Sequence, residues 1–100
     1  MNITINKDAN THVIQVEGRI DTLTSSQLEA ECIPLICDES PNLTFDCTKV
    51  DYISSTGLRV FIMADKKSQS FNGTVTINGL SEFLKDIFDI SGLTDLFVFT

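Results

Sequence analysis

The sequence has few of the residues with which proteins bind metal ions. Its 100 residues include one histidine, His12, and three cysteines, which show no CxxC spacing. Metal sites need several closely spaced ligands of these types, so neither a metal nor another cofactor is expected. The odd number of cysteines indicates reduced, partly buried thiols; they are Cys32, Cys37 and Cys47.

Positive charge is also scarce. The chain has 7 Lys and Arg residues against 14 Asp and Glu residues, a formal net charge of −7 and a pI near 4.3. Its only adjacent basic pair is Lys66-Lys67. Contacts to nucleic acids and to anionic membranes need clustered Lys and Arg, so neither is an expected partner. The acidic charge favours a protein partner, although it also serves simply to keep a small protein in solution.

No segment of the sequence has the features of a targeting signal or a membrane span. Residues Met1 to Lys7 lack the basic segment followed by an apolar one that marks a secretory signal. No apolar run approaches the roughly 20 residues of a membrane-spanning helix. We therefore expect a cytoplasmic protein that does not bind membranes directly. No linker, repeat or low-complexity tract interrupts the sequence, which predicts a single domain over residues 1–100.

Alternating apolar and polar residues predict the strands. The alternation occurs over residues 3–5 and again, after a polar turn, over 13–16, which predicts a β-hairpin. A third strand is predicted from Leu43 to near Lys49, and a fourth has Val75 and Ile77 on one face. The final residues, 96–99, form either a short edge strand or a packed tail.

Three segments have the apolar spacing of helices. The first runs over residues 22–37, with Thr22 or Thr24 as its cap and a kink or break at Pro34, whose ring removes a backbone donor. Asp21, just before it, is a helix-capping or turn residue in an alternative interpretation. The second covers residues 55–68. In the third, five apolar residues share one face before a glycine stop: Leu80, Phe83, Leu84, Ile87 and Phe88, then Gly92. The order β-β-α-β-α-β-α predicts an α/β fold with a mixed sheet of four to five strands.

The segment from Val50 to Arg59 holds the most informative polar cluster. Ser54, Ser55, Thr56 and Gly57 stand between a strand-like stretch and a helix-like one. The first N–H groups of a helix lack backbone partners and can hold an anion, so this is a place where a phosphate fits. Taken alone, the four residues are more typical of a turn and a helix cap.

Four landmarks in the sequence match the pattern of a known family. Ile53 to Arg59 is similar to an apolar residue followed by Asp-Ser-Ser/Thr-Gly-Leu-Gly, as found in STAS domains of the anti-sigma factor antagonist type. Gly18 to Asp21 resembles the family's Gly-Glu-Leu/Ile-Asp, and Ile33 to Leu35 matches an apolar-Pro-Leu in some members. Leu84 to Leu93 is close to the family's C-terminal LFDITGL. The landmarks span the chain in matching order, so the resemblance implies a STAS fold.

The resemblance implies a switch operated by phosphorylation. The family's phosphorylated serine stands two places before the glycine, which is Ser55 here. An anti-sigma factor with ATP-dependent serine kinase activity modifies it, and a serine phosphatase restores it. The unmodified antagonist binds the anti-sigma factor and frees a sigma factor, and the phosphorylated form lets go. The partner-binding residues implied in this way are Asp21, Ser54, Ser55, Thr56, Gly57, Leu58 and Arg59.

Two residues depart from the family's pattern. Ser54 replaces the usual Asp; either side chain can cap a helix, but the charge near Ser55 changes, and Ser54 and Thr56 become alternative acceptors. Arg59 replaces the second glycine and lies four residues beyond Ser55 on the same helical face. We hypothesise that Arg59 pairs with a phosphate on Ser55; alternatively it lies on the surface or contacts the partner.

Two other functions use the same surface: catalysis by an enzyme and the role of an accessory subunit. As the nucleophile of an enzyme, Ser55 would need a base, but His12 lies in the predicted hairpin and the chain has no G-x-S-x-G motif, so an enzyme is not expected. An unphosphorylated STAS domain could instead be an accessory subunit of a transporter or of a lipid-trafficking complex. Phosphorylation of Ser55 distinguishes the regulator from the accessory subunit.

Overall fold

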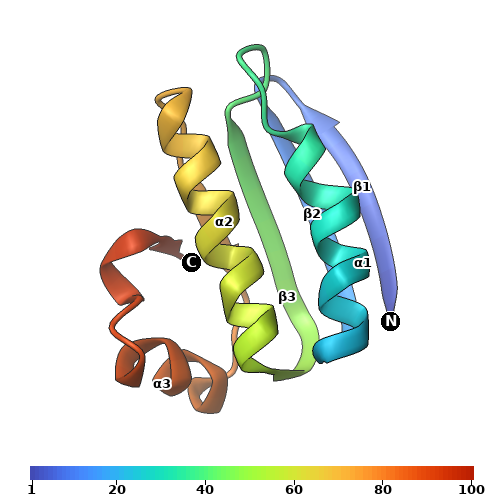
Figure 1. Ribbon diagram of the computed structural model, residues 1–100, viewed down its shortest axis with the longest axis vertical. Coiled ribbons are helices and arrows are strands. Elements are labelled where there is room, and N and C mark those ends of the chain that lie inside the picture. Colours follow the sequence, from blue (N-terminus) through green and yellow to red (C-terminus); the bar gives the residue numbers. More distant parts are fainter.

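The chain begins with a β-hairpin. In the computed structural model, which describes all 100 residues, β1 (Asn2–Asp8) pairs antiparallel with β2 (Thr11–Ile20). Asp8 and Thr11 face each other across a tight turn in which Ala9 has a φ of 54°. The hairpin predicted from the alternating residues is therefore confirmed (Figure 1).

Helices and strands alternate along the rest of the chain. After β2 come α1 (Thr22–Cys32), a 3-10 turn (Ile33–Leu35), β3 (Asn42–Ile53), α2 (Ser55–Ser70), β4 (Val75–Asn78), α3 (Glu82–Ile90), a second 3-10 turn (Thr94–Leu96) and β5 (Val98–Phe99). The predicted element order is confirmed up to α3. Of the two expectations for the last residues, the structure has the short edge strand, which pairs with β4.

The five strands form one mixed sheet in the order β1-β2-β3-β4-β5. Only the β1–β2 pair is antiparallel; the other three pairs are parallel. The C-terminal ends of β2, β3 and β4 therefore lie at one end of the sheet. Figure 1 shows α1 and α2 side by side across one face of the sheet, both starting at that end. The predicted α/β fold with a mixed sheet is confirmed.

The hydrophobic core lies between the sheet and the helices. Alternate residues of β2 and β3, such as Ile14 and Phe45, are fully buried there. Phe61 of α2 packs edge to face against Phe45 and against Phe88 of α3, with ring centroids 4.6 and 5.6 Å apart. Each such aromatic pair adds about 0.5–1.5 kcal/mol to the effect of burial alone. These contacts hold α2 against the sheet and α3 beside it.

Polar side chains occupy the alternate positions of the strands. Between the buried residues of β2 and β3 stand exposed or half-buried polar ones, which include Gln15, Glu17, Asp46 and Thr48. This alternation is the pattern of a sheet with one face packed and one face solvated. None of the helices has the length and apolar composition that crossing a bilayer requires.

Two predicted element ends differ from the structure. α1 ends at Cys32, before Pro34, and the rest of the predicted helix forms a 3-10 turn, so the break expected at the proline is confirmed. β3 does not stop near Lys49 but continues to Ile53. The reason is its neighbour: β3 remains paired with β2 up to the Ile20 and Ile53 pair.

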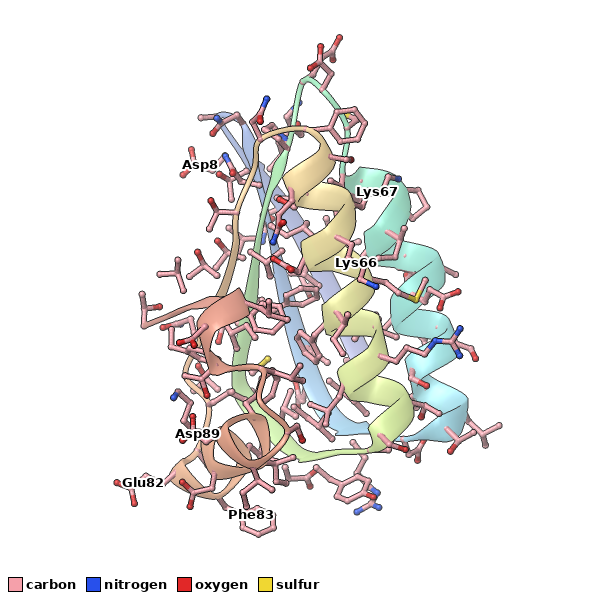
Figure 2. The ribbon with its side chains drawn as sticks, turned by 60° about the vertical axis from the view of Figure 1, so that its left-hand side comes forward. Asp8, Lys66, Lys67, Glu82, Phe83 and Asp89 are labelled. Carbon is pink, nitrogen blue, oxygen red and sulfur yellow. The ribbon has the colours of Figure 1, made fainter.

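α3 buries a narrower face than its apolar residues predict. Leu84 and Phe88 are buried and Ile87 is half-buried, but Phe83 is 68% exposed. Phe83 is turned about 100° around the helix from Leu84, which takes it off the packed face. Figure 2 shows Phe83 projecting outward at the lower end of the molecule. The helix stops as predicted, because Gly92 has a φ of 73°.

The three cysteines are free thiols. Cys32 and Cys47 are buried, and burial raises the pKa of each thiol to about 12, so both are protonated at neutral pH. Cys37 is exposed in a turn that bridges to Ser40, so the prediction of a partly buried thiol is wrong at that position.

Candidate functional site

Two strand-to-helix junctions lie side by side at one end of the sheet. β2 and β3 are paired up to Ile20 and Ile53, and the next residue after each strand, Asp21 or Ser54, caps a helix. The backbone N–H of Ser54 donates a 2.8 Å hydrogen bond to the carbonyl oxygen of Ile20. α1 and α2 therefore begin next to each other, with the positive ends of both helix dipoles at one surface.

Asp21 caps α1 through its carboxylate. Oδ1 accepts hydrogen bonds from the backbone N–H groups of Leu23 and Thr24, each 3.0 Å long, and the Thr24 hydroxyl accepts one from the N–H of Asp21 at 2.8 Å. This is a reciprocal capping box, so the predicted cap at Thr22 or Thr24 is wrong, and the interpretation of Asp21 as a capping residue is confirmed. The backbone and side-chain hydrogen bonds from Thr24 hold the pKa of Asp21 below its ordinary value, and the charge of Arg19 adds to this effect.

Ser54 caps α2 with its hydroxyl. Ser54 Oγ accepts a 3.1 Å hydrogen bond from the N–H of Gly57 and lies 2.7 Å from Thr56 Oγ1 in a hydroxyl–hydroxyl hydrogen bond. The Ser54 carbonyl also accepts from the N–H of Leu58 at 2.9 Å. The expectation that serine could replace aspartate as the cap is confirmed.

Ser55 is the exposed hydroxyl of the turn. Ser54 and Thr56 are half-buried and bonded to each other, whereas Ser55 is exposed and its hydroxyl makes no hydrogen bond within the protein. It is also the first residue of α2, so a group attached to its Oγ would stand at the positive end of the helix dipole. Among the three hydroxyls, only that of Ser55 can be modified without breaking a contact.

Gly57 lets α2 sit directly on the ends of two strands. A Cβ atom at this position would lie 2.7 Å from Ile20 Cγ2 and 3.0 Å from Ile53 Cγ2. It would also lie 3.2 Å from the carbonyl oxygen of Ile20. Real Cβ contacts are not this short, so glycine is required by the close approach of the helix and not by its φ. The position of Ser55 at the surface depends on this packing.

An arginine and a tyrosine stack where β2 and β3 end. Arg19 and Tyr52 are paired across the two strands, and each stands two residues before a helix cap. The guanidinium carbon of Arg19 lies 4.3 Å from the centroid of the Tyr52 ring, which is a cation–π contact. The stack places a partly rigid, positively charged group beside the Ser54 junction.

Arg59 lines a groove between α1 and α2. The groove has a volume of about 220 Å³ and is lined by Thr22, Ser25, Ser26, Glu29, Thr56, Arg59 and Val60. Ser55 is not among these residues. In the unmodified protein the Arg59 side chain therefore lies along the α1 side of α2, beside Thr56, although the helix places it one turn beyond Ser55.

The structure brings the residues predicted to bind a partner to one end of the molecule. Asp21 lies at the first junction, and residues 54–59 lie at the second. Sequence reasoning gave no role to Tyr52 or to the exposed Leu23 in the first turn of α1, and it placed Phe83, exposed in the first turn of α3, on the packed face of that helix. The exposure of Leu23 could have been inferred from the sequence, because Leu23 falls outside the apolar face of α1 that packs on the sheet.

The fold and this site define a class of small α/β domain in which a mixed sheet carries two capped helix starts side by side at one end. The chain belongs to the STAS domain family, whose model matches residues 2–100. It is 35% identical over 98 residues to the anti-sigma-B factor antagonist of Bacillus subtilis, covering 96% of this chain and 89% of that one. It is 36% identical over 99 residues to the anti-sigma-B factor antagonist of Listeria monocytogenes, covering 96% and 87%.

Solved structures share the fold. The anti-sigma factor antagonist SpoIIAA in its unphosphorylated form matches with a TM-score of 0.81 and 13% identity, covering 99% of this chain and 87% of that chain. SpoIIAA of Bacillus in the phosphorylated form matches with a TM-score of 0.79 and 16% identity, covering 99% and 91%. The resemblance to STAS domains of the anti-sigma factor antagonist type, read from four landmarks of the sequence, is confirmed.

Proposed function

We propose that this protein is an anti-sigma factor antagonist whose partner binding is switched by phosphorylation of Ser55. The unmodified protein binds an anti-sigma factor through the surface around Asp21 and residues 54–59, and this binding frees a sigma factor. The same anti-sigma factor acts as a serine kinase on Ser55, and a serine phosphatase reverses the modification. The relatives named as anti-sigma-B factor antagonists, which cover nearly the whole chain, support this assignment.

The exposed, unbonded hydroxyl of Ser55 is the observation that carries the proposal. Ser54 and Thr56 are the other candidate acceptors, but their hydroxyls are bonded to each other, and Ser54 also caps α2. Phosphorylating either would break the cap or the hydroxyl pair. Ser55 offers its oxygen to a kinase at no such cost, which favours it as the acceptor.

The chain supplies the acceptor of the reaction and not its catalyst. In the transfer, Ser55 Oγ bonds to the γ-phosphorus of ATP, the bond to the bridging oxygen breaks, ADP leaves and the hydroxyl proton passes to a base of the kinase. The only histidine, His12, pairs with Leu43 near the start of β3, at the opposite end of the sheet from Ser55. The protein is therefore proposed to be a regulator and not an enzyme.

Phosphorylation should act at the binding surface and not on the fold. A phosphoryl group adds about −1.5 to −2 charges, and at a helix N-terminus the dipole favours negative charge by about 0.3–1 kcal/mol. The domain itself tolerates the change. In an interface the same group must be desolvated or meet carboxylates of the partner. A penalty of about 4 kcal/mol weakens binding by about a thousandfold, which is enough for release.

The proposal is tested by phosphorylating the purified protein and measuring binding. The kinase to use is an ATP-binding anti-sigma factor, sought first in the coding regions next to this gene. The modified residue is located by mass spectrometry as an increase of about 80 Da on the peptide that contains Ser55. Ser55→Ala should remain unmodified, and Ser70→Ala, an exposed serine at the other end of α2, should be modified normally.

Binding measurements on the unmodified and the phosphorylated protein test whether phosphorylation switches partner binding. The unmodified protein should bind the anti-sigma factor, and the phosphorylated protein should bind it about a thousandfold more weakly. Equal affinity of the two forms would refute the switch. Absence of phosphorylation together with stable copurification with a membrane complex would instead support an accessory STAS subunit.

A further inference from the structure

Both arginines of this acidic chain flank the Ser54–Gly57 turn. The sequence holds 14 acidic residues and only two arginines, Arg19 and Arg59. Arg19 lies at the end of β2, two residues before the cap of α1, and Arg59 lies in the second turn of α2, four residues beyond Ser55. The two arginines thus stand near the turn in the sequence of two different elements.

Neither arginine is neutralised by a carboxylate of the protein. The structure contains one salt bridge, which joins Lys85 to Asp89 in α3. Glu17 and Asp21 are the acidic residues closest in sequence to Arg19, and neither forms a salt bridge with it; the Asp21 carboxylate accepts from the N–H groups of α1. Glu29 shares the groove with Arg59 without forming an ion pair. Both guanidinium groups are exposed and can bind an external anion.

The backbone places both arginines near the site of a phosphate on Ser55. Side chains four residues apart on a helix are neighbours, so Arg59 can turn from its groove toward the phosphate. The hydrogen bond from Ser54 to the Ile20 carbonyl holds the end of β2, and with it Arg19, against the start of α2. Guanidinium and phosphate form bidentate, charge-assisted hydrogen bonds, which are stronger than neutral ones.

We propose that Arg19 and Arg59 carry the phosphorylation signal by exchanging one anionic partner for another. This proposal rests on the proposed function. In the unmodified protein the two guanidinium groups bind carboxylates on an acidic patch of the anti-sigma factor. A phosphoryl group on Ser55 draws them onto itself, so the partner loses these contacts and meets a negative charge in their place.

This exchange differs measurably from simple repulsion. If the phosphate acts only by repelling the partner, removing an arginine leaves the ratio of the two dissociation constants unchanged or larger. If the arginines are exchanged, each contributes to the unmodified complex and little to the phosphorylated one. Removing an arginine then weakens only the unmodified complex, and the ratio falls. A cycle that combines phosphorylation with substitution measures this coupling.

The experiment compares Arg19→Gln, Arg59→Gln and the wild type, each unmodified and phosphorylated on Ser55, for binding to the purified anti-sigma factor. Each substitution should weaken the unmodified complex about tenfold, leave the phosphorylated complex unchanged and lower the ratio about tenfold. Lys66→Gln removes an exposed cation from the middle of α2, away from the turn, and should change neither form (Figure 2). Thermal melts of all variants verify that they fold.

A second measurement does not depend on the partner. Phosphorus NMR titration of the phosphorylated protein gives the second pKa of the phosphate, which pairing with guanidinium lowers. Arg19→Gln and Arg59→Gln should each raise this pKa relative to the wild type, and Lys66→Gln should not. A phosphate pKa unchanged in both arginine variants would overturn the exchange.

The outcomes separate this inference from the function on which it rests. If the wild type discriminates between the two forms and both arginine variants keep the same ratio, the exchange is refuted and the proposed switch stands. If the unmodified and phosphorylated wild type bind equally well, the proposed function itself fails. A lower ratio of dissociation constants in the arginine variants, together with a raised phosphate pKa, supports both the exchange and the proposed function.

Discussion

The N–H of Ser54 donates a 2.8 Å hydrogen bond to the carbonyl oxygen of Ile20 and so joins the two helix starts of the domain. Ile20 is the last residue of β2, directly before the cap of α1, and Ser54 is the cap of α2. A shift of the backbone at one junction therefore displaces a hydrogen-bond partner at the other. The exposed surface formed by the two junctions is built on backbone that the sheet holds in place.

Ser54 and Ser55 should have separate roles despite being adjacent. Ser54→Ala removes the oxygen that accepts from Gly57, and loss of an N-cap costs about 0.5–2 kcal/mol of unfolding free energy. Ser55→Ala removes an exposed hydroxyl without a partner and should change stability by less than about 0.5 kcal/mol. Urea unfolding measures both values. Equal destabilisation by the two variants would contradict the assigned cap.

Kinase assays on the same two variants test the assignment of the acceptor. Ser54→Ala should still be phosphorylated, because its acceptor hydroxyl on Ser55 is intact. Ser55→Ala should not be phosphorylated. The opposite result would make Ser54 the acceptor.

Gly57→Ala should destabilise the protein although the position is helical. In an exposed helix this substitution stabilises by about 0.5–1 kcal/mol, because alanine has the higher helix propensity. At Gly57 the new Cβ would meet Ile20 Cγ2 at 2.7 Å and Ile53 Cγ2 at 3.0 Å, so both side chains must shift. Overpacking of this kind costs about 1–3 kcal/mol. The free energy of unfolding should therefore fall on Gly57→Ala, whereas helix propensity alone would raise it.

Chemical unfolding measures this change, and a second substitution provides its control. Ser26→Ala, at an exposed position of α1, should change the unfolding free energy by less than about 0.5 kcal/mol. If Gly57→Ala proved as stable as the wild type, α2 would not be held against the strand ends as closely as the structure indicates.

Periodicity in the sequence predicted the elements well because their packing is regular. The hairpin, the helix that begins at Ser55, the break at Pro34 and the stop at Gly92 each depend on local spacing or on backbone chemistry. The end of β3 was missed because it depends on pairing with β2, which is not a local property. The exposure of Phe83 was missed because its spacing fits the apolar face, while the packing of α3 buries only the side of Leu84 and Phe88.

The candidate site was predicted in its position but not in its details. Landmarks of the family pattern located the turn and Ser55. The cap of α1 was left open in the sequence because Asp21 and two threonines near it are all good caps, and only the geometry selects Asp21 among them. The stack of Arg19 on Tyr52 could not be foreseen, since it depends on the register between two strands.

The stability contributed by Asp21 should disappear in acid. Hydrogen bonds from Thr24 lower the pKa of the folded-state carboxyl, so its stabilising effect is present above the ordinary carboxyl pKa of about 3.9 and is lost as the pH falls through the folded-state pKa. Asp21→Ala should have a lower urea midpoint at pH 7, and its difference from the wild type should shrink below about pH 4.

Two comparisons make the acid experiment specific to Asp21. Asp46 and Asp89 also have lowered pKa values, but both residues are present in the wild type and in Asp21→Ala, so their effects cancel in the difference between the two urea midpoints. Asp21→Asn keeps an oxygen that can cap α1 and lacks the titrating group, so its midpoint should lie between the other two at pH 7. A difference between Asp21→Ala and wild type that stayed constant from pH 7 to pH 3 would show that the carboxylate charge is irrelevant.

Phe83 should contribute to partner binding and not to folding. β4 is parallel to β3, so α3, which follows β4, begins at the same end of the molecule as α2 (Figure 1). Phe83 is 68% exposed there and projects outward (Figure 2). A large, exposed aromatic side chain is a typical anchor of a binding surface. Its truncation often weakens binding tenfold or more, and tenfold corresponds to about 1.4 kcal/mol of binding free energy.

The matched control lies on the same helix. Ile90 is 86% exposed and is the last residue of α3, so it lies at the other end of that helix from Phe83. Phe83→Ala should weaken binding of the anti-sigma factor about tenfold with an unchanged thermal midpoint, and Ile90→Ala should leave both unchanged. Titration calorimetry with the unmodified proteins measures the affinities. If Phe83→Ala bound as tightly as the wild type, the partner surface would not extend to α3 and would be confined to the two junctions at Asp21 and Ser54.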